Sequence, residues 1–334
     1  MQYTHIVGID ISKATIDVAV CQKEATAVIL NRRFSNRLEG YEELLAWLEK
    51  AGIKLEQVLI CLENTGLYHV NLVNFLYSKK GSVWIENAVE IKWSTGLVRG
   101  KSDKADAQRI GLYALKNQDK AKLYAAEDEY LTELSDLLTD RERLVKAKNM
   151  LLGPLKEKQD LGLGKRADRS KEGCKQSVAA LNKDIKGIEK QIAELVKSSK
   201  ELSKNYKLIR SVKGIGMITA LYLIKYTQNF KRLTNPKKLA SYCGIAPFEY
   251  SSGTSIRGKN KVHPMSNKVL KKLLHMCALS SVPIQEGEMR AYYERKVGEG
   301  KNKMSVLNAI RNKLIHRVCA CIRDQKVYSY KQVA

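Results

Sequence analysis

Two aspartates three residues apart, Asp103 and Asp106, stand where a helical pattern of apolar residues begins. Side chains with this spacing project from one face of a helix, about 5–6 Å apart at Cβ. Carboxylates at a helix start also simply offset the helix dipole and cap free amides, so the pair alone does not establish a site. Two further acids, Asp10 and Glu63, each end an apolar stretch typical of a β-strand. We refer to Asp10, Glu63, Asp103 and Asp106 as the four acids.

Four carboxylates at one place would repel one another unless they bind hard cations. Mg²⁺ is the natural ion, because it takes oxygen ligands and is often shared with substrate phosphates. Two such ions, about 3.5–4 Å apart, can bind the attacking and the leaving oxygen of a phosphodiester. If the fold brings the four acids together, we expect them to hold two Mg²⁺ ions for phosphodiester chemistry.

A second chemically promising stretch combines hydroxyls, glycines and cations after Tyr250. It contains three serines and a run of basic residues without an acid, namely Ser251, Ser252, Ser255, Arg257, Lys259 and Lys261. This composition fits a loop that wraps a phosphate. On residue types alone, a phosphate-binding loop is favoured over a catalytic serine, because no triad pattern points to a base, although His263 is near in sequence.

Between these stretches, Lys213-Gly214-Ile-Gly216 separates two helical segments. Apolar-Gly-apolar-Gly turns are typical of the helix-hairpin-helix, whose exposed amides at a helix start can bind a DNA phosphate without reading sequence. Such turns also close helix pairs that bind no ligand. In so basic a chain we expect Lys213, Gly214 and Gly216 to contact nucleic-acid phosphate.

The composition supports a polyanionic partner. The 334 residues, enough for two or three domains, include 59 Lys and Arg against 35 Asp and Glu, a net charge of +24. Nucleic acid is favoured over membrane, because the sequence has no apolar run of spanning length and no signal peptide. The seven cysteines lack the paired spacing of a zinc site. We expect a cytoplasmic, nucleoid-associated protein with reduced thiols.

The elements that must position the four acids follow one another in a definite order. Strand-forming residues occupy 5–10, 15–21 and 27–34, a helix fits 38–50, and an apolar strand over 57–63 ends in Glu63. A helix over 68–77, a strand over 82–85 and helices around Glu90 and Asp103 complete the unit. This is the order of an RNase H-like mixed α/β domain, which we assign to residues 1–120. In this fold the first and fourth strands end at the same edge of the sheet, so Asp10 and Glu63 should lie there. The last helix can bring Asp103 and Asp106 to that edge.

The remaining chain is expected to be helical. Leucines at roughly heptad spacing from 130 to 155, and apolar residues from Val178 to Leu202, predict a coiled-coil arm over 121–205. The glycine-rich basic segment 161–171 is expected to form its turn or tip. The arm fits either self-association or a spacer within one subunit, and its narrow seams favour self-association. Residues 206–334 are expected to form a mainly helical C-terminal domain containing the helix-hairpin-helix.

Two sets of motifs resemble the DEDD transposases of the IS110 family of bacterial insertion sequences. The first set is Gly8-Ile-Asp10-Ile-Ser-Lys13, Leu62-Glu63-Asn-Thr-Gly66 and Ser102-Asp103-Lys-Ala-Asp106-Ala107, with Asn64 where a small residue is more common. The family's N-terminal domain is similar to the Holliday-junction resolvase RuvC. The second set, Gly244-x-x-Pro247 and Tyr250-Ser-Ser252-Gly-x-Ser-x-Arg257-Gly258, resembles its C-terminal domain, in which the serine before the glycine is the nucleophile. Aligned on this core, that serine is Ser252.

The resemblance implies a transposase that cuts and rejoins donor and target DNA through a covalent phosphoserine. The four acids would bind the Mg²⁺ ions, and Arg257 or Lys259 would stabilise developing charge. The resemblance also implies a structured bridge RNA that pairs with both DNAs, and we expect a homo-oligomer, a dimer that becomes a tetramer in the synaptic complex, with a site shared between subunits. Two alternatives are a RuvC-like junction endonuclease that uses water and a non-catalytic nucleic-acid-binding protein.

Overall fold

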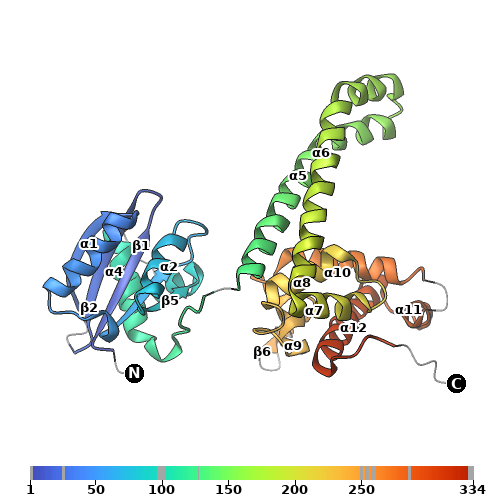
Figure 1. Cartoon of the computed structure of the whole chain (residues 1–334). Coiled ribbons are helices and arrows are strands. Elements are labelled where there is room, and N and C mark those ends of the chain that lie inside the picture. Colours follow the sequence, from blue (N-terminus) through green and yellow to red (C-terminus); the bar gives the residue numbers. More distant parts are fainter. Residues whose placement is uncertain are drawn as a thin grey trace. The chain divides into compact units, whose positions relative to one another are not determined.

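A computed structural model of the chain describes residues 3–24, 27–95, 102–126, 128–248, 251–252, 256–257, 261–284 and 287–329, with the backbone alone at 95, 251–252 and 256–257. The chain divides into two compact units, Met1–Glu127 and Asp128–Ala334 (Figure 1). Among these described residues no helix is both long and apolar enough to cross a membrane.

The first unit is built on a five-stranded mixed sheet. Its strands are β1 His5–Ile11, β2 Thr15–Gln22, β3 Ala27–Ser35, β4 Val58–Glu63 and β5 Ser82–Glu86, in the order β3-β2-β1-β4-β5. The first three strands pair antiparallel as a meander, whereas β4 lies parallel to β1 and β5 parallel to β4. The predicted RNase H-like α/β fold is thereby confirmed.

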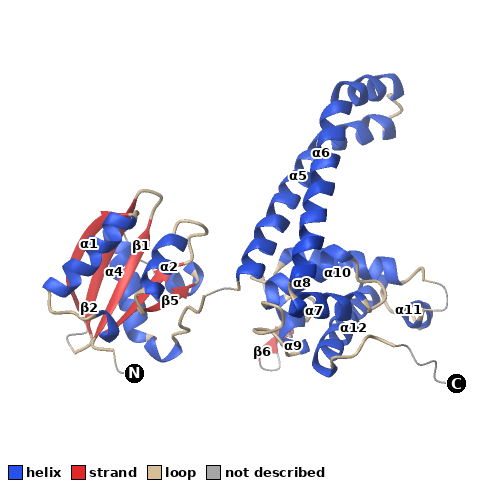
Figure 2. Cartoon of the chain, in the orientation of Figure 1, coloured by secondary structure: helices blue, strands red, loops and turns tan. Residues whose placement is uncertain are grey.

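Helices cover both faces of this sheet (Figure 2). On one face, α1 Leu38–Lys50 and α2 Val70–Ser78 pack against alternate strand residues such as Val7 and Ile60. On the other, α3 Ala88–Thr95 and α4 Asp103–Lys116 pack against the intervening residues, such as Ile6 and Leu59. Short 3₁₀ turns occupy Leu55–Gln57 and Gln118–Lys120. The central strands β1 and β4 are buried on both faces, which explains their continuous apolar sequence.

Two glycines place α4 directly against β1. A Cβ atom built on Gly8 would lie 2.2 Å from the backbone nitrogen of Gly111 and 2.4 Å from the carbonyl oxygen of Ala107. The Ser102 hydroxyl caps the helix start by accepting a hydrogen bond from the Ala105 amide at 3.3 Å. Strand and helix therefore approach backbone to backbone, and the capped end of α4 carries Asp103 as its first residue.

The second unit begins with two long helices, α5 Glu129–Asp160 and α6 Gly164–Ser198, which run side by side as a hairpin (Figure 1). Their buried residues include Leu134 and Leu138 on α5 and Ile185 and Ile192 on α6. The turn expected over 161–171 was too long, because only 161–163 connect the helices, with Gly162 at φ +71°. The lysines, arginines and alanine that follow are good helix formers, and they extend α6 toward the turn.

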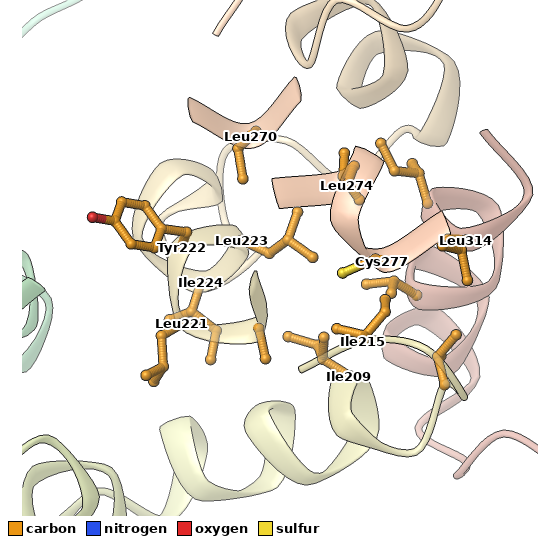
Figure 3. Packing of buried hydrophobic residues seen from close by; sticks show 14 of the residues in the cluster. Ile209, Ile215, Leu221, Tyr222, Leu223, Ile224, Leu270, Leu274, Cys277 and Leu314 are labelled. Carbon is orange, nitrogen blue, oxygen red and sulfur yellow. The ribbon is translucent and has the colours of Figure 1, made fainter. Parts of the chain in front are cut away.

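A helical body completes the second unit. Its helices are α7 Lys200–Arg210, α8 Met217–Thr227, α9 Pro236–Tyr242, α10 Lys268–Ser281, α11 Glu288–Gly298 and α12 Lys303–Asp324, with two short strands, β6 Ser251–Ser252 and β7 Ile256–Arg257. Figure 3 shows how Ile209, Leu223, Leu274 and Leu314, from four of these helices, converge in one apolar core. The seven cysteines are all free, and Cys174 is the one that is not fully buried.

Candidate functional site

Two of the four acids lie side by side at the ends of neighbouring parallel strands. Ile9 of β1 is paired with Leu62 of β4, and Asp10 and Glu63 are the next residues on the two strands. Both project to the face covered by α4, since Ile6 and Gly8 of β1 and Leu59 and Cys61 of β4 share their alternation and contact that helix layer. The order of the strands thus brings Asp10 and Glu63 to one point.

The start of α4 brings the other two acids to this point. Asp106 and Asp103 belong to the first turn of the helix, immediately before the contact of Ala107 and Gly111 with Gly8. The pKa of Asp10 is raised from 3.8 to about 6, first by burial and then by the negative charges of Asp106, Asp103, Glu63 and Asp17. Asp10 is therefore close enough to each of the other three acids predicted from the sequence to interact with it electrostatically.

Two arginines hold the carboxylates of α4. Arg33 donates from Nε to Asp17 Oδ2 at 2.9 Å and from Nη2 to Asp103 Oδ2 at 3.1 Å. Arg109 donates from Nη1 to Asp106 Oδ1 at 2.6 Å. Arg33 stands opposite Asp17 on the neighbouring strand, and the hydrogen bond to Asp17 is the main reason that the pKa of Arg33 is raised.

Sequence reasoning missed Asp17 and Arg33. Asp17 stands opposite Asp10 on β2, and it is only 4% exposed. An aspartate inside an otherwise apolar strand was an available signal, because a buried carboxylate needs a partner. The pairing of Asp17 with Arg33, by contrast, depends on the strand register, and no pattern in the sequence identified it.

A third strand end extends the acidic face. Glu86, at the end of β5, is paired with Glu63. Tyr113 of α4 donates a hydrogen bond from its hydroxyl to Glu86 Oε2 at 3.2 Å. Burial, followed by the charge of Glu86, raises the pKa of Tyr113 to about 12. Glu86 therefore anchors the body of α4 to the sheet on the side of Glu63.

The donor set is suited to a divalent cation, although the side chains do not form a ligand cluster in this conformation. Across the described part of the chain, no three His, Cys, Asp or Glu side chains are grouped as metal ligands. Asp103 and Asp106 face arginines instead. Four mutually repelling carboxylates, one of them half-buried, supply the all-oxygen, negatively charged set that Mg²⁺ takes. Metal binding would require Asp103 and Asp106 to exchange their arginine partners for the ion.

Ser252 lies in a small hairpin of the second unit. In the backbone pairing, Ser252 stands opposite Ile256 and Ser251 opposite Arg257. Phe248 and Lys261 exchange two backbone hydrogen bonds at its base, of 3.0 and 3.3 Å. Of the other expected phosphate-binding residues, Lys259 lies outside the described residues, as does Ser255. The hairpin thus places the backbone of Ser252 and Arg257 on adjacent strands.

The turn between α7 and α8 has one packed side and one open side. Gly214 has φ +94°, and a Cβ atom there would lie 2.7 Å from Cβ of Ser281 on α10. Arg210 Nη1 donates to the Ile215 carbonyl at 2.7 Å, which ties the turn to α7. Gly216 caps α8, and a Cβ atom there would meet nothing within 4 Å. With Lys213 exposed beside it, this open helix start can approach a phosphate.

Two family models match the chain in succession. Residues 7–157 match the DEDD transposase model of the IS110 type, described as transposase. Residues 206–294 match the model of the transposase IS116/IS110/IS902 family. The first match contains the four acids, and the second contains both the α7–α8 turn and the hairpin with Ser252.

Relatives of known name are similar over the whole chain or over part of it. The pilin gene-inverting proteins of Moraxella bovis and Moraxella lacunata are each 26% identical over 330 residues, which cover 98% of this chain and 98% of theirs. An uncharacterised 43.6 kDa protein of insertion element IS110 from Streptomyces coelicolor is 28% identical over 158 residues, 47% of this chain and 38% of that protein. The RuvC structure of T. thermophilus with a Holliday junction aligns with 11% identity and a TM-score of 0.29, over 36% of this chain and 100% of RuvC.

Proposed function

Because the chain belongs to the IS110 family of transposases, we propose that it is a recombinase that cuts and rejoins donor and target DNA through a covalent phosphoserine intermediate. The observation that carries the proposal is the convergence of the four acids on one face of the sheet. Strand order brings Asp10 and Glu63 together, and the Gly8–Gly111 contact brings the start of α4 to them. The name of the full-length relatives, pilin gene-inverting protein, also denotes a rearrangement of DNA.

In this proposal the four acids hold two Mg²⁺ ions, which when bound supply positive charge to the scissile phosphate and help activate the attacking hydroxyl. The role of Asp10 is to offer a half-buried carboxylate, whose raised pKa shows how strongly the site favours neutralisation of its charge. Arg33 and Arg109 keep the carboxylates of Asp103 and Asp106 oriented and partly neutralised in the absence of substrate.

Ser252 is the proposed nucleophile. Its Oγ forms a bond to phosphorus while the bond from phosphorus to one deoxyribose oxygen breaks, and the proton lost by the serine is balanced by one taken up at the leaving oxygen. In the second step a strand-end hydroxyl attacks the phosphoserine and releases the serine hydroxyl. Each step exchanges one phosphoester bond for another, so that rejoining needs no external energy source. Arg257 or Lys259 would stabilise charge on the phosphoryl oxygens.

A guide RNA is proposed as the source of sequence specificity. With a net charge of +24, the protein is suited to binding nucleic-acid backbones. Base pairing by a bridge RNA to donor and target DNA would then read sequence, while the protein holds phosphates. A homo-oligomer, a tetramer in the synaptic complex, would hold the two DNAs together.

A hydrolytic junction endonuclease is the second candidate. The observation in its favour is that all four acids lie within one compact unit, Met1–Glu127, which does not contain Ser252. Such an enzyme would use water as the nucleophile, and the hairpin would only contact phosphate. It would leave a free strand end in place of a protein–DNA link.

The test is a search on denaturing gels for a covalent adduct with labelled donor DNA, in Mg²⁺ with the element's RNA. The proposal expects an adduct that is lost in Ser252→Ala and lost or strongly reduced in Asp10→Ala. Ser251→Ala and Ser255→Ala are matched controls that should keep it. Cleavage that depends on Asp10, is indifferent to Ser252 and forms no adduct would refute the phosphoserine step and establish the hydrolase.

A further inference from the structure

A buried arginine in the helical body has no counter-ion. Arg311, on α12, is 7% exposed, and its Nε atom is buried without a hydrogen-bond partner. No residue of the described chain forms an ion pair with it, and burial alone lowers the pKa of its guanidinium. Buried charges in proteins are normally paired, because an uncompensated one costs several kcal/mol. Arg311 therefore stands out as a group that lacks an anion.

Other polar groups on α10 and α12 also lack hydrogen-bond partners. His275 of α10 faces it closely enough that the charge of Arg311, after burial, lowers the pKa of the imidazole. His275 Nδ1 and Asn312 Oδ1 are also buried without hydrogen-bond partners. Lys271 lies one turn before His275 on α10, and Asn308 lies one turn before Asn312 on α12. We call Lys271, His275, Asn308, Arg311 and Asn312 the Arg311 cluster; it contains two cations and no acid.

The cluster holds the segment that leads to the Ser252 hairpin. Asn308 Nδ2 donates a hydrogen bond to the carbonyl of Ile245 at 2.8 Å. A Cβ atom on the preceding Gly244 would lie 3.5 Å from Cδ of Lys271. Ile245 is followed by Phe248, which begins the hairpin by pairing with Lys261. The cluster is thus attached to the base of the hairpin that carries the proposed nucleophile.

An oxyanion would accept hydrogen bonds from Arg311 Nε and, in the tautomer with a proton on Nδ1, from His275, whereas Asn312 Oδ1 is itself an acceptor and does not bind an anion. A guanidinium presents donors in a planar fork that matches phosphate, and a half-buried site strengthens the interaction. His275, Lys271 and Asn312 are each of intermediate exposure, so parts of their side chains can be reached from solvent. Among the described residues no side-chain carboxylate pairs with Arg311, and an external oxyanion is suited to that place.

We propose that the Arg311 cluster is a binding site for a phosphate group of the nucleic-acid backbone, with Arg311 as its principal donor. The anion site itself does not depend on the proposed function, whereas the assignment of the phosphate to nucleic acid does. Bound there, a backbone phosphate would be held by the helices that anchor the base of the Ser252 hairpin. Arg311 is accordingly a substrate-positioning residue.

The first experiment measures thermal unfolding of the full chain with and without inorganic phosphate, at constant ionic strength. Arg311→Met is compared with Lys313→Met, which removes one charge from the same helix, where Lys313 lies 4.5 Å from the ring centre of Tyr292. We expect Arg311→Met to lose more than half of the phosphate-dependent rise in Tm and Lys313→Met to keep it. An equal rise in both variants would overturn the proposal.

Stability without phosphate provides a second readout. Removing an uncompensated buried charge should raise Tm, so Arg311→Met is expected to be at least as stable as the parent chain in chloride buffer. If Arg311→Met fails to fold, Arg311→Lys replaces it in the experiment. This variant keeps the positive charge but loses the planar fork of the guanidinium, so we expect it to bind phosphate more weakly than the parent chain does. A phosphate response in Arg311→Lys equal to that of the parent chain would contradict the assignment.

Titrations with duplex DNA and with single-stranded RNA identify the source of the phosphate. Arg311→Met should bind the relevant polymer roughly tenfold more weakly and reduce the dependence of log affinity on log salt by about one phosphate contact. Unchanged affinity for both polymers would refute the nucleic-acid assignment. Ser252→Ala should retain the phosphate-dependent rise in Tm, because the anion site does not include the serine. If the parent chain forms no covalent adduct with DNA, the proposed chemistry is refuted, but the phosphate site is not.

Discussion

Gly8 of β1 and Gly111 of α4 approach so closely that a Cβ atom on Gly8 would lie 2.2 Å from the Gly111 nitrogen. No side chain can be accommodated between the two backbones. The close packing of α4 against β1 therefore determines how near Asp103 and Asp106 come to Asp10. The geometry of the four acids depends on this contact as much as on the acids themselves.

Gly8→Ala is expected to lift α4 from β1. The overlap is with backbone atoms, which cannot rotate away, so the free energy of unfolding should fall by at least about 1–3 kcal/mol. Because the start of α4 moves with it, DNA cleavage should fall by about 100-fold in protein that remains folded. Chemical unfolding and cleavage assays measure both. Gly187→Ala, on an exposed helical position with open space, is the control, and equal effects of the two changes would disprove the role of the contact.

Asp10→Asn is expected to stabilise the metal-free protein while abolishing cleavage. The pKa of Asp10 is raised to about 6 in the fold, so its ionised form destabilises the folded state above that pH. The side chain is only half-buried, so we expect a gain on the order of 1 kcal/mol at pH 7.5 after allowance for solvent screening. The gain should shrink as the pH falls through about 6 toward 3.8.

The measurement for Asp10 is Tm in EDTA at pH 7.5 and at pH 5. Asp140→Asn, at an exposed position on α5, is the matched control and should change Tm little at either pH. A variant no more stable than the parent chain at pH 7.5 would show that burial and the neighbouring acids do not destabilise ionised Asp10 in solution.

Arg33→Met is expected to lower Tm by a few degrees, since it leaves the buried Asp17 carboxylate without its partner. Arg32→Met is a close control, because Arg32 is adjacent in sequence, projects from the other face of β3 and stacks on Phe34 instead. The measurement is the Tm of both variants, compared with that of the parent chain. Equal losses would mean that Arg33 acts only through surface charge.

Gly214→Ala is expected to weaken DNA binding by disturbing the α7–α8 turn. An alanine must adopt φ near +94° there and also overlap Ser281, at a cost of about 1–3 kcal/mol. Gly216→Ala, two residues on, meets open space and should cost less. Affinity for a short DNA duplex, measured with both variants, tests the turn. If Gly214→Ala binds DNA as well as the parent chain, the turn does not contact phosphate.

Mixed oligomers test whether one active site draws on two subunits. An Asp10→Ala chain retains Ser252, and a Ser252→Ala chain retains all four acids. If the acids of one subunit serve the serine of another, mixing the two inactive chains should restore roughly a quarter of the parent recombination activity, as expected for random assembly of dimers. Recombination of a donor–target plasmid pair is the readout. Activity that stays absent at every mixing ratio would place each site within one subunit.

Much of the fold was predictable from local patterns. The helix expected at 38–50 is α1, and the expected strands of the sheet agree closely with β1 to β5, because alternating burial and continuous apolar runs leave direct marks on sequence. The turn expected over 161–171 contains the observed reversal at 161–163 but extends too far, since a basic segment with glycines looks like a loop although its lysines and arginines favour helix. The reversal itself occupies 161–163, where Gly162 has a positive φ.

The candidate site was predictable in part. Asp10 and Glu63 could be placed at strand ends, and the spacing of Asp103 and Asp106 indicated a shared helix face. Arg33, Asp17 and the Arg311 cluster were not identified, because the residues around them come from other strands or helices. Arg311 is buried in a tertiary core without a counter-ion among the described residues. The local sequence around it does not indicate this burial.

The amino-acid sequence by itself determined the types of chemical group, their order along the chain and the periodicity of the helices and strands that carry them. Tertiary structure decided which of those groups meet. The physical reason is that local preferences depend on near neighbours in the chain, whereas the approach of Gly8 to Gly111, the bridge of Arg33 from Asp17 to Asp103 and the burial of Arg311 depend on packing between distant segments. Those contacts exist only when the whole unit has folded.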